Sequence, residues 1–483
     1  MSAELTRRDL VKSAIACTAF CVGCSQRQPI FMQPQTTAEG ATPKVAGLIS
    51  PGCRGTKVRV GRIYAGKPSA HWPTPTLDLA EEVKQYELHC ASMKELADVE
   101  FVGNSLVTSV EEAAQARAAM ADVDGILIIH LSMGITPIVR EVLAANKPTV
   151  LFAAPYSGHE WTGFGATVKK QELFDCMLTS DKTKLAAAVR PFRAIHHLRE
   201  AKIVNVTARP WPAEWREAVS RKFGTQFVTV DRERMLKAYE SISEADAETE
   251  ARWWLSHARA VVEPSTDEVV RSCRLALAFE KILDEENATV ITTDCYGSMY
   301  HQLPAFPCVG NVRLNNMGLG GICESDFRSA MTHIILQGLT GRPGFISDPT
   351  MDESRDAIIL AHCLGSMKMD GPDGEIAPFK LRSIMERQEG CVPQVFMRVG
   401  TPVTQAILVG TDQMPFFTGT IIETPDTERG CRTKITVKVD GNARQLWQNW
   451  TPGLHRVTCY GNVREDLTRF CRFTGIKMTD EAA

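Results

Sequence analysis

Short, continuous apolar runs that alternate with helix-like segments constrain the fold of this chain more than any other feature of its sequence. Gly125–Ile129 and Thr149–Ala153 are such runs, and each ends at polar or turn-forming residues. Unbroken apolar strands are typical of parallel sheets that are covered on both faces. Helical segments such as Val110–Met120 lie between them. The pattern predicts a doubly wound α/β domain over residues 44–195.

The same alternation returns further along the chain. Ile203–Val206 and Val290–Thr293 have the pattern of buried strands, and Asp267–Glu285 that of a long helix. After about Val392 the helical period is lost and short strand-like segments follow one another. The chain is therefore predicted to be α/β, with two doubly wound parallel-sheet domains followed by a mainly β, barrel-like C-terminal domain. We expect the second α/β domain at 196–390 and the β-rich domain at 391–483.

The N-terminus has the pattern of an export signal. Thr6–Lys12 contains a twin-arginine motif, and the apolar stretch Ala14–Gly23 is too short to span a bilayer. Residues 1–24 are predicted to be the signal, and 25–43, rich in Gln, Pro, Thr and Ala, a flexible tether. Cys24 follows Val-Gly as in a lipoprotein cleavage site. We expect an exported protein, periplasmic or membrane-anchored through lipid on Cys24; without a working signal it would be cytoplasmic.

Composition narrows the classes of partner. The formal net charge is -3 and the sequence pI is about 6.4, with no long run of Lys or Arg. Because phosphate binding needs a clustered basic surface, nucleic acid is not an expected partner. The chain has 15 cysteines, and outside the signal none has zinc-ribbon spacing. These cysteines are predicted to be buried, small apolar residues without structural zinc.

The densest group of polar residues lies between Pro307 and Met369. Asn311–Cys323 is expected to be a glycine-rich loop that carries Arg313 and Asn315 and delivers Glu324 to the start of a helix. A carboxylate at that place meets free backbone N–H groups and the positive end of the helix dipole, which favour its ionised form.

Asp348 and His362 are each expected at the end of a strand. Asp348 ends an apolar run that Pro349 is predicted to stop, and His362 follows Ile358–Ala361. Ligands bind beyond the carboxyl ends of strands in open α/β sheets, so both residues are site candidates. The alternative is structural: a helix-terminal acid at Glu324, a turn residue at Asp348 and a core histidine at His362.

Four segments, in order, resemble the motifs of the L-fucose and L-arabinose isomerases. Gly320–Phe327 is similar to the segment of that family's first metal carboxylate, and Gly344–Asp348 to the segment of its second. Ala361–Cys363 resembles the histidine segment of the L-arabinose branch, and Gly453–Val457 the C-terminal histidine motif of both branches. The resemblance covers most of the chain after the signal.

The resemblance implies a metal-dependent enzyme. It assigns Glu324, Asp348 and His455 as metal ligands, with His362 as a fourth ligand or a supporting group, and the two carboxylates as proton carriers. The implied cofactor is Mn²⁺ or another divalent cation. The implied reaction is aldose–ketose isomerisation of a free sugar, a pentose or a 6-deoxyhexose, through an enediol, in a homo-oligomer.

Weaker candidates for substrate binding are His130, Arg54, Arg313 and Asn315. His130, at a predicted strand end, resembles the family's first-domain histidine, which reaches the substrate of a neighbouring subunit. Arg54 lies among glycines, where it could contact sugar hydroxyls. For each of the four, a structural or solvated role is the alternative.

Two other functions stay open on the sequence. An export signal is unusual for an enzyme of intracellular sugar catabolism, so a non-catalytic, exported sugar-binding lipoprotein on the same scaffold is one alternative. A metal-dependent hydrolase or lyase is another. Asp348 is similar to the fucose branch and His362 to the arabinose branch, which leaves the sugar undecided.

Overall fold

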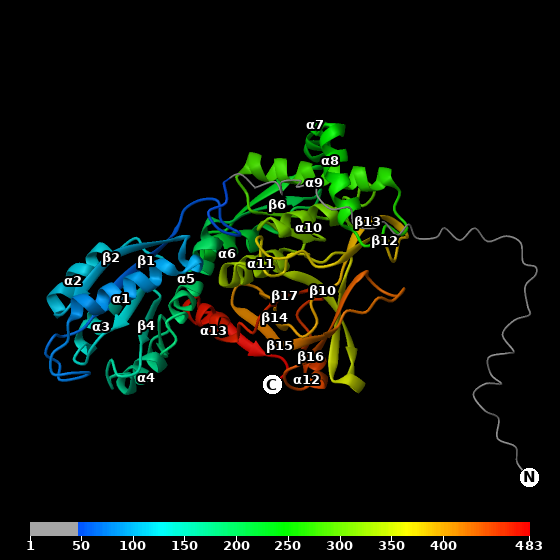
Figure 1. Cartoon of the computed structure of the whole chain (residues 1–483). Coiled ribbons are helices and arrows are strands. Elements are labelled where there is room, and N and C mark those ends of the chain that lie inside the picture. The colour runs from blue at the N-terminus through cyan, green and yellow to red at the C-terminus, as the bar shows by residue number, and fades with distance from the viewer. Residues whose placement is uncertain (1–46) are drawn as a thin grey trace, which may run out of the picture.

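The first five strands of the computed structural model, which describes residues 47–483, form one parallel sheet in the order β2-β1-β3-β4-β5. The strands are β1 (Val58–Ala65), β2 (Val99–Val107), β3 (Gly125–His130), β4 (Thr149–Ala153) and β5 (Phe174–Leu178). The helical elements between them are α1 (Leu79–Ser92), the 3-10 turn η1 (Lys94–Leu96), α2 (Val110–Ala119), α3 (Thr136–Leu143) and α4 (Trp161–Lys170). Figure 1 shows this unit as the blue and cyan body.

Helices cover both faces of this sheet. Alternate strand residues such as Val60 and Leu127 pack with α1 and with the long helix α5 (Lys184–Glu200). Their neighbours Ile63 and Ile128 face the opposite way and pack with α2, α3 and α4. The inner strands β3 and β4 are buried on both sides and apolar along most of their length, which confirms the doubly wound arrangement.

A second parallel sheet follows, with four strands in the order β7-β6-β8-β9. Its strands are β6 (Lys202–Val206), β7 (Gln226–Val230), β8 (Val290–Thr293) and β9 (Gly320–Cys323). Its helices are α6 (Ala213–Phe223), α7 (Arg232–Ser241), α8 (Glu244–His257), α9 (Thr266–Glu286), α10 (Cys308–Asn316) and α11 (Phe327–Thr340). Helices α5, α6 and α11 lie against one face, and α7, α9 and α10 against the other.

The C-terminal part is an antiparallel β-barrel. Its strands are β10 (Phe345–Asp352), β11 (Ala357–His362), β14 (Pro402–Ala406), β15 (Gln413–Glu423), β16 (Thr433–Val439) and β17 (Arg456–Tyr460). Consecutive antiparallel pairings β10-β11-β16-β15-β14-β17 return to β10 and close the ring. Closure leaves these six strands without a free edge.

Smaller elements surround the barrel. Strands β12 (Phe379–Ile384) and β13 (Glu389–Val395) form a separate hairpin, and β18 (Lys477–Asp480) pairs with β15 in parallel. The remaining elements are the 3-10 turn η2 (Glu353–Arg355), α12 (Ala443–Asn449) and α13 (Arg464–Phe473). Helix α5 lies between the first domain and the rest, in contact with α11 and α13 (Figure 1). At that junction the rings of Phe192 and Phe473 stack with centroids 6.0 Å apart.

The structure confirms the predicted fold class and corrects three local expectations. Asn311–Cys323 is not a loop, because its first residues belong to α10 and its last four form β9. Pro349 does not end its strand; β10 continues to Asp352 with Pro349 opposite Leu360. The antiparallel sheet already begins at Phe345, so Asp348 and His362 belong to the barrel and not to an open parallel sheet. Short apolar runs do not distinguish these two settings.

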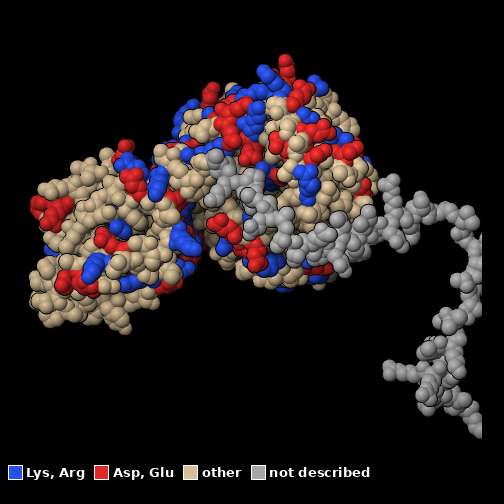
Figure 2. Space-filling view, turned by 45° about the horizontal axis from the view of Figure 1, so that its top comes forward, with Lys and Arg blue, Asp and Glu red and all other residues tan. Residues whose placement is uncertain are grey.

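The surface and the thiols agree with the composition. On the face shown in Figure 2, acidic and basic side chains are interspersed, without a broad patch of one sign. All 12 cysteines within residues 47–483 are free, and ten of them are buried. No helix in that range is long and apolar enough to cross a membrane. The predicted signal at 1–24, including Cys24, and the tether at 25–43 lie outside the described residues.

Candidate metal and catalytic centre

Glu324 stands at the carboxyl end of β9, on a turn with an unusual backbone. Glu324 and Ser325 have φ angles of 60° and 54°, in the left-handed region that β-carbon-bearing residues rarely adopt. Such residues cost about 1–3 kcal/mol each and persist only where neighbouring contacts hold them. Here the Ser325 N–H donates to the Thr293 carbonyl, and the Trp211 indole N–H donates to the Ser325 carbonyl at 2.8 Å. The turn directs Glu324 from the second sheet toward the barrel.

The strand that carries this turn is fixed by a glycine and an amide. A β-carbon on Gly321 would lie 2.3 Å from the Cα of Asn311, so only glycine fits where α10 crosses β9. The Asn315 side chain accepts from the Gly321 N–H at 2.8 Å and donates to the Gly321 carbonyl at 3.2 Å. Asn315 therefore holds β9 in register.

Strand register in the barrel brings the other three residues together. Strand β10 lies between β11 and β17. Asp348 is paired with Ala361, the neighbour of His362, and Ser347 is paired with Arg456, the neighbour of His455. Residues that are far apart in the sequence thus occupy adjacent positions at one end of the barrel, facing the end of β9.

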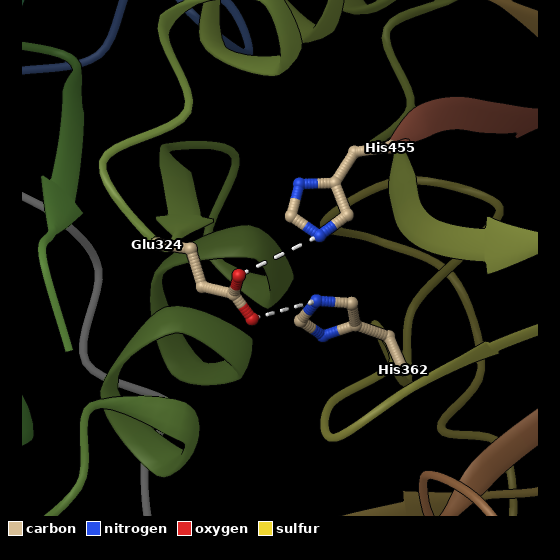
Figure 3. Close-up of side chains that lie close together, drawn as sticks. All are labelled: Glu324, His362 and His455. Carbon is tan, nitrogen blue, oxygen red and sulfur yellow. Dashed lines mark ion pairs between the residues drawn. The ribbon is translucent and has the colours of Figure 1, made fainter. Parts of the chain in front are cut away.

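The four side chains form one cluster. His455 Nε2 lies 3.3 Å from Asp348 Oδ1 and 3.8 Å from Glu324 Oε2, and His362 Nε2 lies 3.7 Å from Glu324 Oε1. The centroids of the two imidazole rings are 5.3 Å apart. Figure 3 shows both rings with a nitrogen turned toward the Glu324 carboxylate. The four residues predicted as metal ligands are therefore neighbours in the fold.

A fifth residue, Asp326, was assigned no role from the sequence. Its Oδ2 accepts a hydrogen bond from His455 Nδ1 at 3.0 Å, which leaves Nε2 directed at the two other carboxylates. Its Oδ1 accepts from the backbone N–H groups of Arg328 and Ser329, which caps α11. One carboxylate thus starts the helix and orients the imidazole. The Asp-x-x-Ser pattern signals the cap, but nothing local in the sequence signals the contact with His455.

The carboxylates of the cluster differ in their electrostatic environment. Burial raises the pKa of Glu324 and of Asp348 above their ordinary values, although the charge of His455 opposes the rise. Burial also tends to raise the pKa of Asp326. The hydrogen bonds from His455 and Ser329 and the charge of His455 outweigh it and lower that pKa overall. Asp326, and not Glu324, occupies the capping position of α11, so the predicted stabilisation of ionised Glu324 by a helix terminus is wrong.

The two imidazoles also differ in their pKa values. Burial lowers the pKa of His362 to about 3, assisted by the charge of His455, so His362 is neutral near pH 7. Burial also disfavours the charged form of His455, but its hydrogen bond to Asp326 and the three nearby carboxylates raise its pKa to about 9. The cluster therefore stabilises positive charge at His455 Nε2, where a proton and a divalent cation would compete.

The donor atoms fit a divalent cation. Within residues 47–483, His455 Nε2 and Asp348 Oδ1 are buried without a hydrogen-bond partner, a costly state for polar atoms. One ligand atom each from Glu324, His362 and His455 lie within 4.8 Å of one another. Two carboxylates with imidazole nitrogen suit Mn²⁺ or a similar ion better than a thiolate-preferring one.

The four residues predicted to bind substrate have other partners. Arg54 pairs with Asp284 at 2.6 Å, and Arg313 pairs with Glu280 at 2.6 Å. The Asn315 side chain is hydrogen-bonded to the backbone of Gly321 in β9. The Arg54 ion pair joins the segment before β1 to α9, the other contacts lie within the second α/β unit, and none of them involves the four-residue cluster.

His130 lies in the first domain and is 2% exposed. Its Nδ1 is 2.7 Å from the Ser157 hydroxyl, and its Nε2 is 3.1 Å from Glu160 Oε2. Glu160 also accepts from the backbone N–H groups of Gly134, Ile135 and Thr136. His130 therefore belongs to a buried network at the carboxyl end of the first sheet, separate in the chain's own fold from the four-residue cluster.

Comparison with known proteins gives two similarities of low identity. The chain is 24% identical over 304 residues to a protein of Clostridium sp. (strain MSTE9) named sulfoquinovose isomerase, covering 59% of this chain and 65% of that protein. It is 26% identical over 148 residues to a protein of Alkalicoccus urumqiensis with the same name, covering 29% and 32%. The chain thus spans less than two thirds of either relative. No family model matches it. In sequence, the chain is therefore similar to sugar isomerases.

Proposed function

We propose that the chain is a divalent-metal-dependent aldose–ketose isomerase that moves a proton between C1 and C2 of a sugar through an enediol. The observation that carries the proposal is the meeting of Glu324, Asp348, His362 and His455 at the junction of β9 and the barrel. Glu324, Asp348 and His455 would hold the metal, with His362 beside them. A bound divalent cation would polarise the sugar carbonyl and stabilise the negative charge of the enediolate.

The chain's own groups supply the proton transfer. Glu324 and Asp348 are the carboxylates that would carry the proton between C1 and C2, since general acid–base transfer needs a carboxylate within reach of the substrate. Both carboxylates lie near the same imidazole nitrogen of His455, at 3.8 Å and 3.3 Å, so they would act on one bound sugar at the same end of the barrel. Asp326 fixes the orientation of that ring.

An anionic 6-deoxyhexose is the substrate we propose within the expected sugars. The relatives' name denotes a sulfonated 6-deoxyhexose. Arg387 lies on the loop between β12 and β13, with its guanidinium 5.3 Å from the Tyr296 ring centroid and 5.0 Å from that of Tyr300. A guanidinium that stacks on two aromatic rings keeps its charge and its N–H donors, which suit an anionic ligand such as a sulfonate.

The position of Arg387 relative to the cluster follows from strand order. Tyr296 comes just after β8, and Glu324 just after the neighbouring β9, with Thr293 paired to Cys323. A sugar whose C1 and C2 lie at Glu324 could extend along the tyrosines toward Arg387. We expect Arg387→Gln to raise KM about tenfold or more for a sulfonated sugar, with little change for the neutral 6-deoxyhexose. Equal effects on both sugars would contradict the assignment of Arg387.

The isomerase proposal is tested by isotope exchange. Purified protein is incubated in D₂O with Mn²⁺ and either a 6-deoxyhexose or its 6-sulfonate, and deuterium at C2 is measured by NMR. We expect exchange in the wild type, its loss in Glu324→Gln, and normal exchange in Glu353→Gln, which changes an exposed acid on η2. Sugar binding without any exchange would favour the sugar-binding lipoprotein instead.

We also propose a homo-oligomer. Tyr156, Trp161 and Leu178 lie near the carboxyl end of the first sheet and are 76%, 49% and 53% exposed. They surround the pocket beside His159, close to the His130 network. Large apolar side chains exposed together favour a protein interface. Trp161→Glu is expected to lower the mass measured by light scattering, whereas Leu88→Glu, on the exposed side of α1, is expected to leave it unchanged.

The predicted export signal stays a proposal. If the signal is cleaved after Gly23 and Cys24 is lipidated, the mature protein begins with a diacylated Cys24 and is tethered to a membrane. Mass spectrometry of the mature N-terminus distinguishes that product from a chain cleaved elsewhere and from an unprocessed chain.

A further inference from the structure

A second group of metal-ligating side chains lies next to the first in the fold. Cys363, Glu386 and Cys431 each offer one ligand atom, and these three atoms lie within 4.8 Å of one another. Cys363 follows His362 at the end of β11, Glu386 is on the β12–β13 loop, and Cys431 precedes β16. Three separate segments therefore meet at this Cys-Glu-Cys group, although the sequence spacing of its members carries no metal-binding motif.

The separations are close to those that a tetrahedral ion needs. In a zinc site with Zn–S bonds of about 2.3 Å, neighbouring ligand atoms lie roughly 3.7 Å apart. Cys431 Sγ is 3.2 Å from Glu386 Oε1, and the Tyr296 phenol oxygen is 4.0 Å from Cys363 Sγ. Small side-chain rotations would bring three protein ligands to one centre, with the phenol or water at the fourth position.

The chemistry of the donors differs from that of the first cluster. Thiolate sulfur prefers soft or borderline ions such as Zn²⁺, whereas carboxylate oxygen and imidazole nitrogen accommodate Mn²⁺. Cys363 is buried and Cys431 is half-buried, which shields the pair from bulk solvent, while Glu386 is exposed and gives an ion a route of entry. The thiol protons would pass to solvent as the ion binds.

We propose that Cys363, Glu386 and Cys431 form a second, thiolate-rich binding site for Zn²⁺ or a similar soft divalent cation, separate from the site at Glu324. An ion there would tie the β12–β13 loop, which carries Arg387, to the ends of β11 and β16. The site is expected to hold metal whether or not the chain isomerises sugars, so its test is independent of the proposed function.

Cobalt spectroscopy tests the site directly. The full chain, purified with reductant and freed of metal, is first saturated with Mn²⁺ and then titrated with Co²⁺. We expect one equivalent of Co²⁺ to give a thiolate-to-cobalt charge-transfer band in the near ultraviolet, and Zn²⁺ to remove it. Asp348→Asn, which changes only the first cluster, should keep the band. A wild-type spectrum without that band would overturn the proposal.

Variants locate the site. Cys431→Ser should lose the band and one equivalent of tightly bound Zn²⁺ by mass spectrometry of metal content, whereas Cys176→Ser, a half-buried thiol in the first domain, should keep both. Glu386→Gln changes an exposed side chain and is expected to weaken Zn²⁺ binding at least tenfold even if Cys431→Ser fails to fold. Equal zinc content in all variants, or a loss of two titratable thiols through a Cys363–Cys431 disulfide, would contradict the proposal.

Discussion

Replacing Asp326 by Asn separates two functions of one carboxylate. In the wild type, Oδ1 caps α11 through the N–H groups of Arg328 and Ser329, and Oδ2 accepts from His455 Nδ1 at 3.0 Å. Asn keeps a capping oxygen but places an NH₂ group beside His455, which cannot accept that hydrogen bond. Asp326→Asn should therefore leave the helix intact and disturb the imidazole.

The magnitudes follow from these contacts. Loss of a carboxylate that orients a ligating histidine typically weakens metal binding 10–100-fold, about 1.4–2.8 kcal/mol. Asn and Asp cap helices about equally well, so the free energy of unfolding should change by less than about 0.5 kcal/mol. Asp326→Ala removes the cap as well and should cost roughly a further 1 kcal/mol of stability.

The assay is the Mn²⁺ dissociation constant, measured by electron paramagnetic resonance of the free ion, alongside urea unfolding. Asp231 provides a matched control because it caps α7 through the N–H of Arg234 at 2.8 Å without any contact with the cluster. Asp231→Asn should change neither quantity, and Asp231→Ala only the stability. Unchanged Mn²⁺ affinity in Asp326→Asn would refute the assigned role of Asp326.

Two further predictions concern the scaffold. Gly321→Ala should destabilise the chain by about 1–3 kcal/mol or more in urea unfolding, because the added β-carbon would lie 2.3 Å from the Asn311 backbone. As a control, Gly165→Ala, in open space on α4, should stabilise the chain by about 0.5–1 kcal/mol. An unchanged free energy of unfolding in Gly321→Ala would contradict the close packing of α10 on β9. Burial opposes ionisation of Glu160, but hydrogen bonds from His130, Thr136 and backbone N–H groups lower its pKa to about 2 from 4.5. The resulting stabilisation, on the order of 3 kcal/mol, is fully present above pH 4.5 and is lost as the pH falls toward 2. The difference in free energy of unfolding between wild type and Glu160→Gln should therefore shrink over that pH range. A difference that does not change with pH would contradict this prediction.

The sequence predicted the layers of the fold well, because a strand that is buried on both faces is an unbroken apolar run in the sequence. Runs such as Gly125–Ile129 and Val290–Thr293 are apolar throughout, and the structure has them as inner strands of two parallel sheets. The same signal placed Phe345–Asp348 in the wrong kind of sheet, since an apolar run does not reveal the direction of its partners. Because Asn311–Cys323 is rich in glycine, the sequence also predicted a loop where the structure has the end of α10 and β9.

The sequence marked Glu324, Asp348 and His362 as candidates by their expected places at helix and strand ends, whereas His455 was found only through the resemblance. Nothing local links His455 to Asp348, which meet because β10 lies between β11 and β17. Arg313 was expected near substrate because it stands close to Glu324 in the chain, but its partners Glu250 and Glu280 come from α8 and α9. Asp326 and the Cys-Glu-Cys group were missed for the same reason: their contacts are long-range and leave no periodic pattern.

Anomalous X-ray scattering from a Mn²⁺-soaked crystal shows whether Glu324, Asp348 and His455 bind one metal ion. Data collected on both sides of the manganese absorption edge identify the ion and its position without reference to activity. We expect one manganese peak with Glu324, Asp348 and His455 atoms at about 2.0–2.3 Å, the range for a divalent ion with oxygen and nitrogen ligands. Full occupancy by manganese elsewhere, with these three side chains left without an ion, would contradict it.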